Sequence, residues 1–201
     1  MTLPTESTRP FKCACAEDGE PKLQNLTVGF KYDTTATSAN LKEHLIKARG
    51  LTDLGNYVIL KDQFTFLITF ESGHVTLTGL RAFSDIRIAQ RKILRILKIK
   101  FRSVTRSIKV YNLCASGKLN QTFNLNNLKS VLALNETWTF TFNTAFFPGL
   151  FTKLPNLGTI TIFQNGKFTI VGSKTIATVC QICKIITAHI NRYQSHILSM
   201  T

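Results

Sequence analysis

The stretch LITFESGHVTLTGLRA, residues 67–82, has a counterpart at residues 160–175, which read ITIFQNGKFTIVGSKT. Each stretch has the pattern of two short strands joined by a turn that contains glycine. The same separation of 93 residues (163 − 70, 166 − 73 and 172 − 79) joins three pairs of positions: Phe70 and Phe163, Gly73 and Gly166, and Gly79 and Gly172. Three aligned pairs without a gap indicate an internal duplication, which has to be recognised first because it determines the fold.

Around these stretches the same order of elements is predicted twice: a strand, a short helix, several antiparallel strands and a long helix. In the first half we predict strands at 21–32, 57–60, 64–70 and 75–79, and helices at 41–50 and 84–101. In the second half we predict strands at 108–117, 146–154, 158–163 and 167–172, and helices at 125–134 and 174–196. The predicted domains are a flexible N-terminal tail at 1–20, a first repeat at 21–105 and a second repeat at 106–197.

Apolar side chains alternate along the strands, as at Leu26, Val28 and Phe30. The last helix carries apolar residues at the spacing of a core-facing side: Ile176, Val179, Cys183, Ile186 and Ile190. We therefore predict an α+β fold, in which one continuous twisted antiparallel sheet is covered by helices on one side. The other side of the sheet must then contact something else.

The charge of the chain points to a polyanionic partner. Its 201 residues include 25 Lys and Arg against 11 Asp and Glu, a formal net charge of +14. Such an excess favours nucleic acid first and an anionic membrane second, although a basic protein without either partner would have the same charge. No apolar stretch reaches membrane-spanning length and the N-terminus has no signal pattern, so we expect a cytosolic or nuclear protein. The five cysteines are then expected to be reduced thiols.

Several motifs, most of them present in both halves, resemble the core domain of the TATA-box-binding protein family over about Pro21 to Ile190. Leu23-Gln24-Asn25 opens the first half and Val110-Tyr111-Asn112 the second. The turn Phe-x-Ser/Asn-Gly occurs at Phe70 and Phe163, glycines end both stretches, and the second half contains Phe147-Pro148-Gly149-Leu150. The resemblance implies two tandem pseudo-symmetric repeats that form a saddle-shaped antiparallel sheet, with helices on the convex side.

In that family the concave sheet binds the DNA minor groove, and aromatic wedges unstack base steps and kink the duplex. The resemblance makes Asn25 and Asn112 base contacts near the dyad, and Phe70, Phe147 and Phe163 wedges. Position by position, it implies DNA contacts by Asn25, Thr27, Tyr57, Ile68, Phe70, Thr76, Thr78, Arg81, Asn112, Cys114, Phe147, Pro148, Lys153, Thr161, Phe163, Lys167, Thr169, Val171 and Lys174. Without the resemblance, the phenylalanines would be read as core aromatics and the asparagines as strand-edge residues bonded to backbone.

The sequence also departs from the family's pattern. The second wedge of the first half has no phenylalanine, and Tyr57 and Leu54 are the two candidates for that position. Val171 stands where the family has a second central threonine. Apolar positions of the sheet are hydroxylated at Thr27, Thr76, Thr161 and Thr169, and Asn143-Thr144-Ala145 replaces a glutamate pair that the family uses to bind the general factor B. These departures predict a relaxed TATA preference and an altered choice of partner.

A basic face is predicted on the helix at 84–101. Its cations recur every three or four residues: Arg87, Arg91, Arg95, Lys98 and Arg102. Apolar residues fall on the opposite face: Ile86, Ala89, Ile93, Ile96 and Leu97. The alternatives are a solvated face and, by the resemblance, a convex surface that binds regulatory proteins.

No catalytic constellation is recognised, so we expect no enzyme. Cys180 and Cys183 form a CxxC and Cys13 and Cys15 a CxC, but cysteines three apart on a helix favour a core position over a metal site, and no cofactor or metal is predicted.

The resemblance implies a general transcription initiation factor, located in a nucleus or a virus-infected cell. It would bind double-stranded promoter DNA in the minor groove, bend it, and nucleate assembly of the preinitiation complex. The implied partners are DNA, general transcription factors and the RNA polymerase machinery, with no membrane and no small-molecule substrate. Two alternatives are an interaction scaffold of the same fold that no longer bends DNA, and a basic RNA-binding protein.

Overall fold

The computed structural model of the chain describes residues 21–34, 45, 50–99 and 108–193. The predicted tail at 1–20, most of the predicted helix at 41–50, the CxC pair and Arg102 lie outside the described residues. The chain divides into two compact units, one that runs over Asn25–Tyr111 and one that contains the chain from Asn112 onward.

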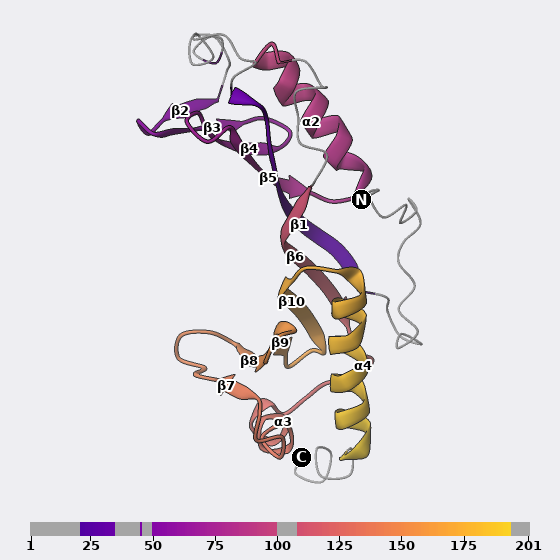
Figure 1. Cartoon of the computed structure of the whole chain (residues 1–201). Coiled ribbons are helices and arrows are strands. Elements are labelled where there is room, and N and C mark those ends of the chain that lie inside the picture. Colours follow the sequence, from indigo (N-terminus) through magenta and orange to yellow (C-terminus); the bar gives the residue numbers. More distant parts are fainter. Residues whose placement is uncertain (1–20, 35–44, 46–49, 100–107, 194–201) are drawn as a thin grey trace. The chain divides into compact units, whose positions relative to one another are not determined.

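The strands of the first unit lie in the order β2-β3-β4-β5-β1, and all neighbours are antiparallel (Figure 1). Their bounds are β1 (Lys22–Lys31), β2 (Leu51–Asp53), β3 (Tyr57–Lys61), β4 (Thr65–Thr69) and β5 (His74–Leu80). Figure 1 shows α2 (Ser84–Ile96) alongside this sheet. The short β2 is a strand that the sequence analysis did not predict.

The sheet of the first unit has one buried and one open face because side chains alternate along each strand. Val58, Phe66, Val75 and Leu77 are fully buried. The residues directly before and after each of them in its strand are half-buried or exposed. From α2, the buried side chains are Ile86, Ala89, Gln90, Ile93 and Leu94. This helix therefore closes the core on one side of the sheet.

The helix α2 ends at Ile96, five residues before the predicted end at Phe101. Lys98 has a φ of +55°, which is outside the right-handed helical region and stops the helix. Lys98 therefore does not continue the helical face of Arg87, Arg91 and Arg95. Ile96 is only half-buried, although the periodicity placed it in the core.

The strands of the second unit lie in the order β6-β10-β9-β8-β7. Their bounds are β6 (Lys109–Lys118), β7 (Thr139–Thr141), β8 (Gly149–Leu154), β9 (Gly158–Phe163) and β10 (Lys167–Ser173). The unit also contains α3 (Leu125–Leu132) and α4 (Ile176–Arg192), of which α4 runs beside β10 (Figure 1). The strand β7 was not predicted.

The helices of the second unit begin at side-chain caps. Asn124 accepts from the backbone N–H groups of Asn126 and Asn127, and Thr175 accepts from that of Thr178. The buried side chains of α4 are Val179, Ile182, Cys183, Ile186 and Ile190. Four of these were predicted from the spacing, whereas Ile176 is half-buried at the start of the helix. No helix among the described residues is long and apolar enough to cross a membrane.

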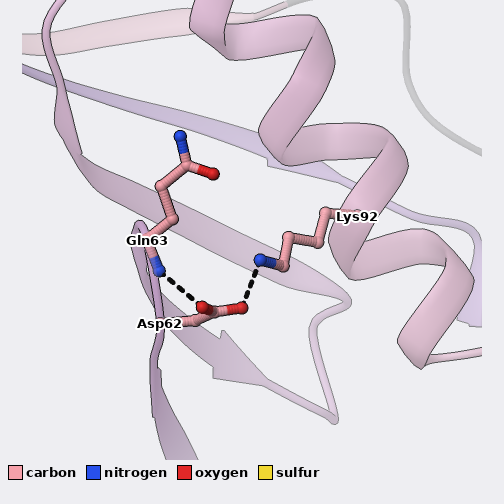
Figure 2. Close-up of polar contacts among 3 residues, drawn as sticks. All are labelled: Asp62, Gln63 and Lys92. Carbon is pink, nitrogen blue, oxygen red and sulfur yellow. Dashed lines mark hydrogen bonds and ion pairs between the residues drawn. The ribbon is translucent and has the colours of Figure 1, made fainter.

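An ion pair joins the two layers of the first unit. The Lys92 ammonium on α2 contacts the Asp62 carboxylate in the turn between β3 and β4, and the Gln63 backbone N–H donates to the same carboxylate at 2.7 Å (Figure 2). The Lys92 and Gln63 hydrogen bonds lower the pKa of Asp62 below its ordinary value. This contact ties the β3–β4 hairpin to the helix.

We predict that Asp62→Asn lowers the free energy of unfolding slightly at neutral pH, because an exposed pair contributes little. A lowered folded-state pKa stabilises the protein above the unfolded-state pKa, and this contribution disappears as the pH falls through the folded-state value. Denaturant unfolding of wild type and variant should therefore converge in acid. Lys92→Gln should cost about the same, and the double variant no more than either single one. A constant difference at every pH would contradict the role of the ion pair.

Candidate nucleic-acid interface

The open face of the first unit is lined with hydroxyl groups. Thr76 on β5 pairs with Gly29 on β1 and Leu67 on β4, and Thr78 pairs with Thr65. The Thr27 and Thr78 hydroxyls lie 3.0 Å apart. Three predicted contact residues, Thr27, Thr76 and Thr78, therefore share one half-buried surface.

Ile68 does not belong to this open face, so the prediction that it contacts DNA is wrong. Its side chain is fully buried, and its cross-strand partners Val58 and Val75 are fully buried too. Partners in an antiparallel pair point to the same side of a sheet. Ile68 therefore packs in the core, and Leu67 is the apolar residue of β4 on the open face.

The two predicted asparagines are held by glycine backbone. The Gly79 N–H donates to Asn25 Oδ1, and the Gly172 N–H donates to Asn112 Oδ1, each at 2.8 Å. Both glycines have positive φ, +87° and +85°, and both lie beside an irregularity in strand register. Only glycine adopts this backbone without strain. The N–H of a glycine in this conformation therefore holds each asparagine side chain in place.

These bonds decide what the asparagines can offer to a ligand. Because the carboxamide oxygens accept internally, the NH₂ groups are the atoms left for an external acceptor. Asn25 Nδ2 makes a 3.3 Å contact with Thr78 Oγ1. For Asn112, the structure shows the hydrogen bond that its Oδ1 accepts from the Gly172 N–H.

In the second unit, three aromatic rings gather at one end of the open face. The ring centroid of Phe147 lies 5.7 Å from that of Phe163 and 4.7 Å from that of Phe151. Phe147 keeps 37% of its side chain exposed. Phe163 pairs with Gly149, and a Cβ there would lie 2.7 Å from the Phe147 ring and 3.1 Å from the Phe163 ring. The glycine leaves the space in which the rings meet.

The first unit has no equivalent aromatic cluster among its described residues. Phe70 is half-buried at the end of β4. The two candidates for the missing wedge are both exposed, Leu54 at 48% and Tyr57 at 38%, and the Leu54 N–H donates to the Tyr57 carbonyl. Tyr57 pairs with Thr69, the residue before Phe70. The exposed side chains at this end of the first unit are therefore an aliphatic and a phenolic one, and the spacing of 93 residues (147 − 54) matches Leu54 to Phe147.

The remaining predicted contacts of the second unit fall on the same open face. Thr169 pairs with Ser116 and Thr161, and Thr161 pairs with Phe151. Next to them on this face, Thr159 pairs with Val171 on one side and with Lys153 on the other. Thr161 is only 5% exposed. Cys114 on β6 is half-buried, and burial raises the pKa of its thiol.

The predicted basic residues are at the surface. The side chains of Arg81, Lys153, Lys167 and Lys174 are exposed, as is Pro148 beside the aromatic cluster. Arg87, Arg91 and Arg95 are exposed on α2, away from its buried side chains. Asn143, Thr144 and Ala145, which replace the family's acidic pair, are exposed too.

Sequence reasoning missed Phe151. Its position two residues after Gly149 places both residues on one face of β8, and this alternation was the available signal. It also missed the contact between Tyr111 and His74, which lie 37 residues apart in the sequence. No sequence spacing would have indicated that contact.

The cysteine pair on α4 packs against the core. Cys183 is buried, and burial, with Cys180 close by, raises the pKa of its thiol to about 12. The thiol therefore stays protonated at neutral pH. The described residues contain no group of three or more His, Cys, Asp or Glu that could hold a metal ion.

The family model of transcription factor TFIID, or TATA-binding protein, matches residues 107–193. A TATA-box-binding protein of Archaeoglobus fulgidus is 28% identical over 79% of this chain and 88% of its own length. That of Pyrococcus horikoshii is 28% identical over 63% of this chain and 65% of its own length, and that of Tetrahymena thermophila 26% over 80% and 65%. The solved structure of Methanococcus jannaschii TBP superposes with a TM-score of 0.70 at 23% identity, covering 86% of this chain and 98% of that one. This likeness confirms the predicted α+β fold class.

We predict that Gly149→Ala destabilises the second unit by about 1–3 kcal/mol, because the new methyl group would overlap the Phe147 ring and the Thr161 methyl, 2.7 and 2.8 Å from its carbon. Denaturant unfolding measures the loss. Adding Phe147→Ala should recover much of it by removing the overlapping ring. An equal loss in both backgrounds would show that Gly149 is needed for another reason.

Proposed function

Because this chain is a divergent member of the TATA-box-binding protein family, we propose that it is a transcription initiation factor that binds promoter DNA in the minor groove and bends it. The family acts on DNA and has no enzymatic activity, and this chain is accordingly not an enzyme. We propose three specific steps. Aromatic side chains insert between base pairs, the open sheet faces contact the minor groove, and the complex nucleates assembly of the preinitiation complex.

The observation that carries the proposal is the aromatic cluster of Phe147, Phe151 and Phe163. A monomer that had no partner for Phe147 would gain by burying it, yet the ring stays 37% exposed at the rim of an open sheet face. An apolar wedge at that position can enter a base step, unstack it, and widen the minor groove. The cost of unstacking is then offset by contact between DNA and the sheet.

The asparagines supply the base contacts in this proposal. The minor groove of an A·T pair presents two acceptors, adenine N3 and thymine O2. The Asn25 and Asn112 oxygens accept from Gly79 and Gly172, which leaves the NH₂ groups as the donors for a base, although Asn25 Nδ2 also contacts Thr78 Oγ1. Donors opposite acceptors fit A·T pairs, in line with the TATA-box-binding proteins that this chain resembles.

The threonines on the open faces widen the choice of sequence. A G·C pair places the guanine amino group, a donor, in the minor groove. A hydroxyl can accept from that group, whereas an apolar side chain leaves it unsatisfied. Thr27, Thr76 and Thr169 are half-buried on the open faces, and a hydroxyl that donates within the protein, as Thr27 can to Thr78, still has a lone pair with which to accept.

Partners and location follow from the same premise. The exposed Arg87, Arg91 and Arg95 form a basic surface that fits an acidic protein of the transcription machinery, and Lys167 and Lys174 would approach phosphates. Nuclear location stays a prediction, because the relatives include proteins of archaea, whose cells have no nucleus. The two repeats, at 21–105 and 106–197, are proposed as the two DNA-binding halves.

We predict that selection from a pool of random duplexes enriches an A·T-rich site in which some positions accept G·C. The reason is that the donors of Asn25 and Asn112 favour A·T, while the threonine hydroxyls tolerate guanine. Replacing Thr27 and Thr169 by valine should return the selected site toward uniform A·T. Failure to enrich any duplex would overturn DNA binding, and preference for single-stranded RNA would favour the RNA-binding alternative.

We predict that the two ends of the bound DNA are kinked unequally. The second unit inserts phenylalanines, whereas leucine has no ring to stack on a base and tyrosine carries a hydroxyl that needs a hydrogen bond. Phe147→Ala and Phe163→Ala should remove most of the bend, while Leu54→Ala and Tyr57→Ala should change it little. Fluorescence energy transfer between the ends of a saturated duplex measures the angle. Equal losses from all four variants would contradict the asymmetry, and a straight duplex bound by wild type would favour the scaffold alternative.

A further inference from the structure

A second cluster lies on the first unit, centred on the ring of Tyr111. The His74 Nε2 atom lies 2.7 Å from the Tyr111 hydroxyl, and the two ring centroids are 5.9 Å apart. The Lys109 ammonium lies over the same tyrosine ring, 5.7 Å from its centroid. Lys31 on β1 is the direct cross-strand partner of His74 on β5. All four residues belong to the compact unit Asn25–Tyr111, because the division between the two units falls within β6, after Tyr111.

Gly29 makes room for this arrangement. A Cβ at Gly29 would lie 2.6 Å from the Tyr111 hydroxyl oxygen and 2.8 Å from Tyr111 Cζ. Gly29 pairs with Thr76, so the tyrosine ring lies on the open face of the sheet, beside the hydroxyl-lined surface. The ring is thus held in place by packing as well as by its bond to His74.

The cluster contains two lysines. Lys31 faces His74 from β1 and Lys109 approaches from β6, while the β4 neighbour Thr69 is neutral. The one carboxylate in the turn before His74 is Glu71, which is exposed. Burial and the charge of Lys31 lower the pKa of His74 below its ordinary value, so the imidazole is neutral at pH 7.

The duplication gives this cluster a counterpart with a different side chain. Lys167 stands 93 residues after His74 (167 − 74), at the same place relative to the glycine turn. Lys167 is exposed on β10 and carries a permanent positive charge. The first unit thus has a titratable group where the second unit has a fixed cation.

We propose that Lys31, His74 and Lys109, arranged around Tyr111, bind a phosphate of the DNA backbone, and that this binding is coupled to protonation of His74. This inference rests on the proposed function. A phosphate placed among the three side chains favours the imidazolium form, because an opposite charge stabilises it. The imidazolium Nε2–H donates to the Tyr111 oxygen, and the tyrosine O–H is then directed to a phosphate oxygen. The second unit, with Lys167, binds its phosphate without taking up a proton.

The test is the salt dependence of duplex binding at two pH values. Each phosphate neutralised by a protein cation adds about one unit to the slope of log K against log salt. For wild type, the slope should be steeper by about one unit at about pH 5.5 than at about pH 8, because His74 is protonated in the complex at the lower pH. Fluorescence anisotropy of a duplex from the random pool, with the full chain, measures both slopes.

Matched variants separate the coupling from general effects of charge. His74→Gln should have the shallow slope at both pH values, and His74→Lys the steep slope at both. Lys167→Gln should lower the slope equally at both. Tyr111→Phe keeps the ring over Gly29 and should lose most of the gain in affinity at low pH. In wild type, the NMR titration of the His74 ring should shift to higher pH when duplex is added.

The outcomes distinguish this inference from the proposed function. Duplex binding with the same pH dependence in His74→Gln as in wild type would overturn the phosphate site and leave DNA binding in place. An unchanged His74 titration on adding duplex would overturn it as well. If wild type binds no duplex at either pH, both the phosphate site and the proposed function are wrong.

Discussion

Alternation of side chains along antiparallel strands is the constraint on which the rest of the structure depends. In each unit, the longer strands bury their apolar residues on one face, where α2 covers the first unit and α4 the second. The alternating side chains of these strands are thereby presented on an open face, opposite the one that α2 or α4 covers. Threonines, asparagines and exposed aromatic rings collect there, because the same alternation that builds the core excludes them from it.

Two local interruptions of that alternation orient polar side chains on the open face. At Gly79 and Gly172 the register shifts, the backbone takes positive φ, and the glycine N–H is turned toward an asparagine side chain. The asparagine oxygen is thereby used within the protein, and the NH₂ group is the part of the side chain that can still donate to a further acceptor. A polar group that is oriented before binding loses less entropy when the ligand arrives, which favours affinity and selectivity.

The two units carry different side chains at corresponding positions of the open face. The second unit has phenylalanines at its rim and a fixed cation at Lys167, whereas the first has Leu54 and Tyr57 at its rim and His74 at the equivalent of Lys167. If the two units bind the two ends of one DNA site, as proposed above, these unequal side chains would distinguish the ends. The asymmetry is consistent with a chain that has the fold of a solved TATA-binding protein but is only 28% identical to an archaeal TATA-box-binding protein.

The sequence by itself indicated an internal duplication, the order of most elements, a resemblance to the TATA-box-binding protein family, and the faces of strands whose apolar residues alternate cleanly. It also identified Phe147 and Phe163, since their motifs mark them. The tertiary structure alone decided which face of the sheet Ile68 occupies. The residues Phe64-Thr65-Phe66-Leu67-Ile68 place apolar side chains on both faces of β4, so the sequence did not show which face is buried. It alone brought Phe151 into the aromatic cluster and Tyr111 against His74, and it ended α2 at Ile96. Contacts of this kind depend on register between strands distant in sequence, and a shift of one residue would reverse every face.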